Sequence, residues 1–156
     1  MAERLNLIDL AGPMPPDVTS VALVICEKVL TEESHVCSAI RVADVFEVTE
    51  GPIVAHALLV IKTEPTADAN REHSLEVRLF NPQGVARRIS RENEIVKYFS
   101  SIPDPGVHGG ITVAIDLNFS GHPVGTYMLR VWLDGEEVSK APIMLLPARV
   151  EAPSSD

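Results

Sequence analysis

The stretch Gly125-Thr-Tyr-Met-Leu-Arg-Val-Trp-Leu-Asp-Gly-Glu-Glu-Val-Ser-Lys-Ala-Pro-Ile-Met-Leu-Leu146 decides the fold class of this chain. Two apolar runs flank the pair Asp134-Gly135. An Asp-Gly pair adopts positive φ at little cost, so it closes a tight hairpin between antiparallel strands. The stretch therefore predicts an antiparallel β domain, and it contains no signature of a particular activity.

Further runs with strand-like patterns precede this hairpin. The first is apolar on both faces over Val21–Ile25, which indicates a central, buried strand. Residues 91–100 suit either a short helix capped by Ser90 or a strand. The pattern predicts an all-β antiparallel sandwich of seven to eight strands with at most one short helix. The upstream strands are expected at Thr19–Leu30, Val36–Val48, Val54–Thr63, His73–Phe80, Val85–Ser90 and Ile111–Phe119.

The length of 156 residues fits one domain with two extensions. Residues 1–18 are expected to form an extended arm, because Gly12-Pro-Met-Pro-Pro16 cannot be a helix interior or a central strand. The sandwich itself is expected over residues 19–147. Residues 148–156 have the polar composition of a flexible tail.

The charge of the chain restricts its partners. The formal net charge is −9, and an acidic surface repels nucleic-acid phosphates and anionic membranes. No apolar run approaches the ~20 residues that span a bilayer. The first residues carry two acids and lack the basic and apolar regions of a secretory signal. We therefore expect a cytoplasmic protein that binds neither nucleic acid nor membrane.

Two cysteines, Cys26 and Cys37, lie on neighbouring expected strands. In a cytoplasmic chain such thiols are expected to stay reduced and to pack as small apolar side chains. Two thiols supply only half of a tetrahedral zinc shell, which speaks against a metal site. Whether the two cysteines ever pair is left open by the sequence.

The entry into the hairpin resembles a known structural feature. Pro123-Val-Gly-Thr-Tyr127 is similar to the tyrosine corner of immunoglobulin-like sandwiches, in which the phenol bonds back to the backbone just upstream. This resemblance implies an immunoglobulin-like fold. The cysteine–tryptophan–cysteine order of antibody domains is absent, because Trp132 follows both cysteines.

A second resemblance spans more of the chain. The strand Val21-Ala-Leu-Val-Ile-Cys-Glu27 leads directly into a second strand, and the chain closes with Tyr127-Met-Leu-Arg-Val-Trp-Leu-Asp-Gly-Glu-Glu137. Together these segments resemble a family of small uncharacterised bacterial proteins, described only as a domain of unknown function. The resemblance implies a bacterial cytoplasmic sandwich and gives no chemistry.

Signatures of catalysis are missing from the sequence. It has no His-Glu-x-x-His pair and no Gly-x-Ser-x-Gly elbow, so we expect no enzyme, no catalytic residue, no metal ligand and no cofactor. The most suggestive loop contains Asp104 and His108, because the glycines around His108 allow close approach to a ligand.

The end of the chain carries more apolar surface than one sheet face requires. Trp132 points away from the face of Tyr127, and it is either buried against a second layer or part of an exposed contact patch. The last run, Ala141–Leu146, is apolar on both faces and would be an aggregation hazard as a free edge. The candidate interface residues are therefore Trp132, Ile143 and Leu145.

These observations favour a non-enzymatic binding or assembly module. It would contact a protein partner, or a second copy in a homo-oligomer, through a strand edge, the Trp132 face or the N-terminal arm. The alternative is a sandwich that binds a ligand or metal in its end loops, or an unrecognised enzyme.

Overall fold

The computed structural model describes residues 15, 17–33, 36–48, 53–64, 72–89, 93–100 and 109–149. Within these ranges the regular structure consists of ten strands without a helix, so no helix there could cross a membrane. The all-β prediction is confirmed, whereas the expected seven to eight strands are too few. The strands are β1 (Val18–Thr31), β2 (Cys37–Val42), β3 (Val45–Glu47), β4 (Val54–Thr63), β5 (Glu72–Phe80), β6 (Ala86–Arg87), β7 (Glu94–Ser100), β8 (Gly109–Asn118), β9 (Gly125–Leu133) and β10 (Glu136–Leu146).

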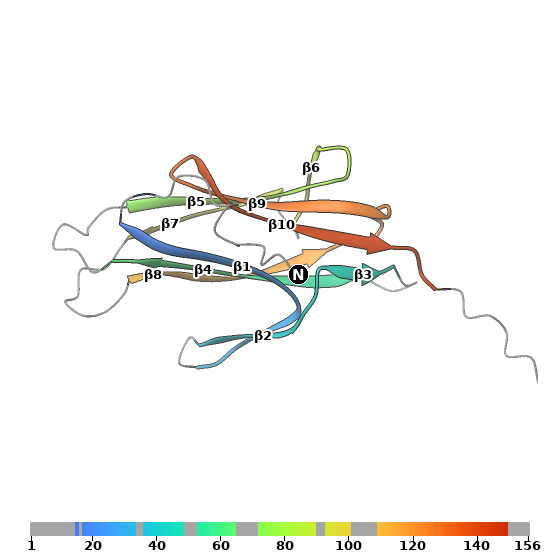
Figure 1. The fold of residues 1–156 in the computed structure, drawn as a ribbon, viewed down its shortest axis with the longest axis horizontal. Helices are drawn as coiled ribbons and strands as arrows, with labels where there is room; N and C mark the ends of the chain where they lie inside the picture. Colours follow the sequence, from blue (N-terminus) through green and yellow to red (C-terminus); the bar gives the residue numbers. More distant parts are fainter. Residues whose placement is uncertain are drawn as a thin grey trace, which may run out of the picture.

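The strands form two sheets that lie one above the other (Figure 1). Sheet A has the order β2-β1-β4-β8, and sheet B has the order β3-β10-β9-β5, with β6 and β7 both pairing with β5. Neighbouring strands are antiparallel, with the exception of the parallel pair β3 and β10. A parallel pair cannot be joined by a tight turn, which is why β3 and β10 are far apart in the sequence.

The core lies between the two sheets and follows the period of two that strands impose. In β5, β8 and β9 every second side chain is buried, and the intervening ones point outward. Each fully buried leucine contributes about 2 kcal/mol to stability through the removal of its side chain from water. The largest fully buried side chains are those of Tyr127, Phe119, Leu59, Ile61, Leu75, Leu79, Ile89, Ile115, Leu117, Leu129, Leu133 and Ile143.

The predicted hairpin is present as β9 and β10. Asp134 has φ of 52° and Gly135 has φ of 85°, the two positive values that a tight hairpin turn needs. Beyond the turn Glu136 pairs with Leu133, and pairing continues to Leu145 opposite Gly125. The Asp-Gly pair therefore closes the hairpin, and a register shift between Glu137 and Ser139 sets which β10 side chains face the core further along.

One upstream segment differs from the prediction, and another decides between two alternatives. The expected strand Val36–Val48 is broken into β2 and β3, since the chain turns at Ala43 and Asp44. The segment for which a helix was an alternative is strand β7, antiparallel to β5. Beyond this turn, β3 pairs with β10 in sheet B.

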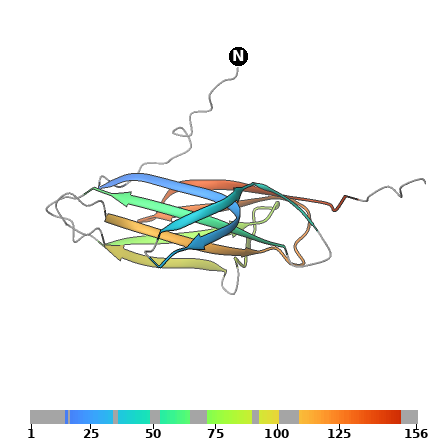
Figure 2. The same cartoon turned by 90° about the horizontal axis from the view of Figure 1, so that it is seen from below.

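The first strand does not remain inside the sandwich along its whole length. It pairs with β4 from Val18 to Cys26, and from Cys26 to Thr31 it pairs with β2 alone. We call Cys26–Thr31 together with Cys37–Val42 the ribbon. In Figure 1 the ribbon bends away from the layer of β4 and β8, and in Figure 2 it crosses in front of that layer. The prediction of a central, buried strand is wrong for β1, because Val18–Ile25 pairs with β4 on one side only and Ile25 alone is buried within Val21–Ile25.

Candidate functional site

The predicted interface residues of the last strand lie in the core. Ile143 is 0% exposed and Leu145 is 1% exposed, because alternation turns their side chains toward sheet A. The outward neighbours are Met144 and Leu146. In addition, β3 pairs with β10 at Met144–Leu146, so this part of the expected free edge is covered. Ile143 and Leu145 are therefore corrected from surface to core residues.

Trp132 lies on the outer face of sheet B, so the second layer does not bury it. Its ring meets the Phe80 ring edge to face at 6.1 Å, and the Arg78 guanidinium lies 5.7 Å from the ring centre. Arg78 also donates to Glu94 at 2.9 Å, and Arg130 lies 5.2 Å from the Phe80 ring. These contacts cover much of the indole within the chain itself, so the Trp132 face is a less accessible surface than the sequence suggested.

The predicted ligand-loop residues Asp104 and His108 lie outside the described residues. Strand β8 begins directly after this loop, and an open hollow of about 400 Å³ lies over the ends of β4 and β8. A Cβ atom at Gly110 would meet the Ile61 carbonyl oxygen at 1.9 Å, so close strand pairing explains this glycine without a ligand. Lys62 contributes the one charged side chain among the hollow's lining residues.

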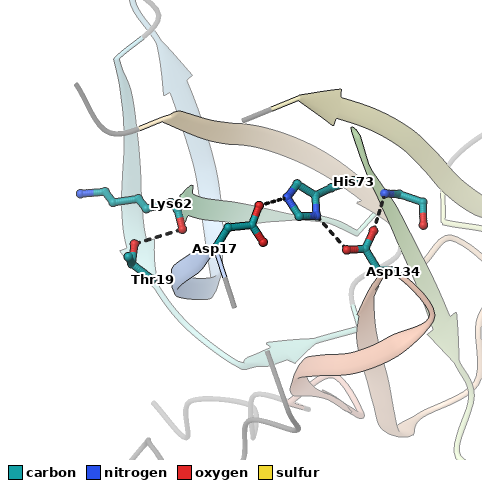
Figure 3. Close-up of polar contacts among 6 residues, drawn as sticks. Asp17, Thr19, Lys62, His73 and Asp134 are labelled. Carbon is teal, nitrogen blue, oxygen red and sulfur yellow. Dashed lines mark hydrogen bonds and ion pairs between the residues drawn. The ribbon is translucent and has the colours of Figure 1, made fainter. Parts of the chain in front are cut away.

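A polar cluster that the sequence did not indicate lies at one end of the sandwich (Figure 3). His73 is 0% exposed, and its two ring nitrogens contact different carboxylates. Nδ1 lies 2.7 Å from Oδ2 of Asp134, and Nε2 lies 2.6 Å from Oδ2 of Asp17. The Ser74 amide donates to the second oxygen of Asp134 at 3.0 Å, and the Phe99 ring stacks on His73 at 5.2 Å.

The hydrogen bonds of this cluster connect three chain segments. Each of the two imidazole nitrogens lies within hydrogen-bond distance of a carboxylate oxygen from a different chain segment. The cluster thereby ties the start of β1, the start of β5 and the β9–β10 turn together. Because both nitrogens are engaged and the ring is buried, His73 has no free nitrogen for a metal or a substrate. Among the described residues, no group of three or more histidine, cysteine, aspartate or glutamate side chains is placed to hold a metal ion.

The sequence offered little that could have revealed the cluster. Asp134 is already explained by its place in the hairpin turn, and His73 by its place at a strand start. Asp17 follows a proline-rich segment with no periodicity. The three residues meet only because β5 pairs with β9 and Asp17, just before β1, lies against His73.

A second histidine lies on the outer face of sheet A. Nδ1 of His56 is 2.8 Å from Oδ1 of Asp116, and the register places Cys26 on the other side of His56. The Cys26 thiol is buried and donates to the Lys28 carbonyl at 3.4 Å. Burial raises its pKa, although backbone hydrogen bonds act in the opposite direction. A buried thiol that holds its proton is a poor nucleophile. The neighbouring side chains of Cys26, His56 and Asp116 therefore do not form a nucleophilic catalytic arrangement.

Both cysteines are free in the structure. Cys26 pairs with Val42, whereas Cys37 pairs with Thr31, five positions further along β1. At the rise of a strand this separation is about 16 Å, and adjacent positions also alternate between faces. The ribbon therefore holds the two thiols apart.

The ribbon presents an accessible apolar surface. Leu30 is 43% exposed, Ile40 is 39% exposed and Val42 is 72% exposed, and the register places all three on one face. Within the described part of the chain, the outer edge of β2 has no strand partner. Large apolar side chains next to unpaired backbone groups are what a strand-adding partner requires.

Comparison with protein-family models gives no match, and comparison with curated proteins gives none either. Among solved structures, the chain is similar to the Pseudomonas fluorescens alkylpurine DNA glycosylase AlkC bound to DNA containing an abasic site analog, with 13% identity and a TM-score of 0.35 over 79% of this chain and 30% of that one. It is also similar to the beta-glucosidase from Listeria innocua in complex with isofagomine, with 13% identity and a TM-score of 0.41 over 84% of this chain.

The chain spans less than a third of the length of these structures, 30% of the glycosylase and 16% of the glucosidase. Both are enzymes, so the prediction that this chain is not an enzyme is wrong on this comparison and is withdrawn. The activities named are those of the matched proteins, and at TM-scores of 0.35 and 0.41 the likeness assigns none of them to this chain.

Proposed function

We propose that this chain is a binding or assembly module, built on an immunoglobulin-like β-sandwich, that contacts a protein through the ribbon. The observation that carries the proposal is the row of exposed Leu30, Ile40 and Val42 beside the outer edge of β2. Single exposed apolar residues are ordinary, but a contiguous group on a projecting element is typical of a contact surface.

The finer fold assignment is supported by Tyr127. Its hydroxyl donates to the Pro123 carbonyl at 2.8 Å, four residues upstream, and its ring packs edge to face on Phe119 at 5.2 Å. This contact is the one that defines the tyrosine corner of immunoglobulin-like sandwiches. It supports the immunoglobulin-like part of the proposal and bears on no activity.

The ribbon is favoured over the other two candidate surfaces. The Trp132 face already uses Arg78 and Arg130 in contacts within the chain. The N-terminal arm lies largely outside the described residues. The ribbon combines apolar side chains with unpaired backbone groups along the described part of β2. The free thiols of Cys26 and Cys37 fit the proposed cytoplasmic location of a bacterial protein.

The proposal is tested by comparing matched surface variants. Wild-type protein, Ile40→Lys and Val96→Lys are immobilised and exposed to an extract of the source cells, and the captured proteins are identified by mass spectrometry. Val96 is an exposed apolar residue on the outer face of β7, so its variant adds the same charge away from the ribbon. We expect Ile40→Lys alone to lose captured proteins, this chain included among them. Equal capture by all three would refute the ribbon as the contact surface.

A further inference from the structure

The edge strand β2 is unusual for an acidic protein. The chain has a net charge of −9, yet Cys37-Ser-Ala-Ile-Arg-Val42 contains no carboxylate and no proline, and Arg41 is its one charged residue. Natural sheets discourage edge pairing by lysines, prolines or very short edge strands. Strand β2 has no lysine and no proline. Its main irregularity is the positive φ of 51° at Arg41, near the end of the strand.

Several other edges of the two sheets are short or carry charged side chains in the described part of the chain. Strand β3 has three residues, which is too short to template much pairing. Strand β7 carries Glu94 and Lys97, and β8 carries Asp116. The edge of β1 over Val18–Val24 pairs with β4 alone and also lacks acidic side chains, but its large apolar side chains are buried or half-buried. Strand β2 differs in placing Ile40 and Val42 at an exposed edge.

A second copy of this chain fits that edge. When two identical strands pair antiparallel about a two-fold axis normal to the sheet, residues with equal spacing from the axis face each other on the same side. About Ala39, the pairs are Ala39 with Ala39, Ser38 with Ile40 and Cys37 with Arg41 of the other copy. Leu30 continues the row of Ser38 within its own copy, so small Ser38 lies between Leu30 and the other copy's Ile40.

We infer that the ribbon is a homodimer interface in which β2 pairs antiparallel with β2 of a second copy, so that sheet A continues across the two-fold axis. This inference rests on the proposed function and names the partner. Pairing satisfies the outward backbone groups of β2 and covers Ile40 and Leu30 of both copies. The same contact cannot propagate into a fibre, because each β2 edge is used once in a closed pair.

Charge is compatible with this pairing and disfavours most others. Each copy carries a net charge of −9, and β2 has no carboxylate, so pairing there places fewer like charges opposite each other than pairing at an acidic edge would. The two Arg41 side chains would lie four residues apart along the strands, about 13 Å, which exceeds the Debye length of about 8 Å at physiological salt. Each Arg41 also donates to Glu27 of its own copy at 3.2 Å.

The size of the contact sets its expected strength. A stable interface buries about 1,200–2,000 Å² in total, and one strand edge with a few apolar side chains falls at or below the lower limit. We therefore expect a reversible dimer whose fraction rises with protein concentration.

Sedimentation equilibrium over a wide concentration range tests the inference. We expect wild-type and Val96→Lys protein to dimerise over the same range of concentration. Ile40→Lys should need at least a tenfold higher concentration to reach the same fraction of dimer. Circular dichroism checks that all three are folded. A wild-type monomer at every concentration, or identical association by Ile40→Lys, would overturn the inference.

Disulfide cross-linking gives an independent test of geometry. In a Cys37→Ser background, Ser38→Cys, Ala39→Cys and Ile40→Cys are oxidised separately at a concentration where the wild type is dimeric. Residues on the two-fold axis have Cα atoms about 4.5–5.5 Å apart, which suits a disulfide. We expect Ala39→Cys to form covalent dimers fastest, and Val96→Cys to form none. Equal, slow cross-linking at all four positions would contradict β2 pairing.

The two proposals fail differently. If the wild type stays monomeric while Ile40→Lys still loses partners captured from the extract, the second-copy inference is wrong and the binding proposal stands. If Ile40→Lys changes neither association nor capture, both are wrong.

Discussion

Two hairpins of this molecule share antiparallel pairing and an apolar face but have different surroundings. In β9 and β10, Tyr127, Leu129, Val131 and Leu133 are all 0% exposed, because sheet A covers that face. In the ribbon, Leu30, Ile40 and Val42 remain exposed at 43%, 39% and 72%. Both hairpins are antiparallel ladders with apolar side chains on one face. The alternation of a strand therefore selects a face, whereas burial requires a second layer opposite it.

The ends of the two hairpins show the same contrast. The β9–β10 turn is held by Asp134, which reaches His73 at 2.7 Å and the Ser74 amide at 3.0 Å. Near the end of the ribbon the side-chain contacts are those of exposed groups, Arg41 with Glu27 and Thr31 with Cys37. One hairpin belongs to the core, and the other is available to a partner.

The largest expected effect is a difference in the loss of unfolding free energy when a leucine is truncated in each hairpin. Leu129→Ala removes a fully buried side chain from β9 and should lower the free energy of unfolding by about 2–5 kcal/mol. Leu30→Ala in the ribbon should change it by at most about 0.5 kcal/mol in the monomer. Urea unfolding at low protein concentration measures both. Similar losses for the two variants would show that the ribbon is part of the core.

The polar cluster at the end of the β9–β10 hairpin gives the next effect. His73→Ala leaves the carboxylates of Asp17 and Asp134 facing a buried space, and should cost about 3 kcal/mol. His56→Ala is the matched control, since its partner Asp116 has a side chain 73% exposed and the pair should contribute at most about 1 kcal/mol. Thermal unfolding compares the two variants. Equal destabilisation would mean that the buried cluster is no stronger a joint than the surface pair.

Tyr127 provides a smaller effect with a defined pH dependence. Tyr127→Phe removes the hydrogen bond to Pro123 and should cost about 1 kcal/mol at neutral pH. Burial raises the pKa of the Tyr127 phenol, and the Arg87 charge opposes this in part. The folded state therefore retains its proton where the unfolded chain releases it. This contribution is intact below the unfolded pKa of about 10 and is lost as the pH rises through the folded value.

Unfolding curves from neutral pH to pH 11 follow this effect. Wild-type protein should lose stability above about pH 10 more steeply than Tyr127→Phe, so that the two curves approach each other. Parallel curves across that range would show that the phenol has the same proton affinity in both states.

The smallest effect on stability is expected in the ribbon itself. Ile40→Lys replaces a partly exposed side chain at a sheet edge and should change monomer stability by about 0.5 kcal/mol or less. Dilute samples in urea measure this change. A loss above about 2 kcal/mol would mean that Ile40 supports the monomer fold, and its effect on association would then need another explanation.

The elements that could be predicted from the sequence are those decided by local pattern. Asp134-Gly135 requires positive φ at two neighbouring positions, so the final hairpin follows directly. The alternation in β8 and the prediction of Tyr127 bonded to upstream backbone have the same local origin. The break between β2 and β3 could not be predicted, because it depends on β10 offering a parallel edge to β3.

The candidate site depended on non-local facts. Ile143 and Leu145 belong to a run that is apolar on both faces, so nothing in that run says which face sheet A covers. The exposure of the ribbon could not be predicted for the same reason. A strand that extends away from the sandwich can have the same apolar pattern as one inside it. The meeting of Asp17, His73 and Asp134 requires three chain segments to converge.

Amide hydrogen exchange of β2 tests the central claim most directly. The exchange of Ser38, Ala39 and Ile40 amides is measured at a dilute and a concentrated protein sample, with β9 amides as the internal reference. Pairing with a second copy predicts that the outward-facing amides of β2 exchange more slowly in the concentrated sample, while β9 is unchanged. Identical β2 exchange at both concentrations in the wild type would contradict the account.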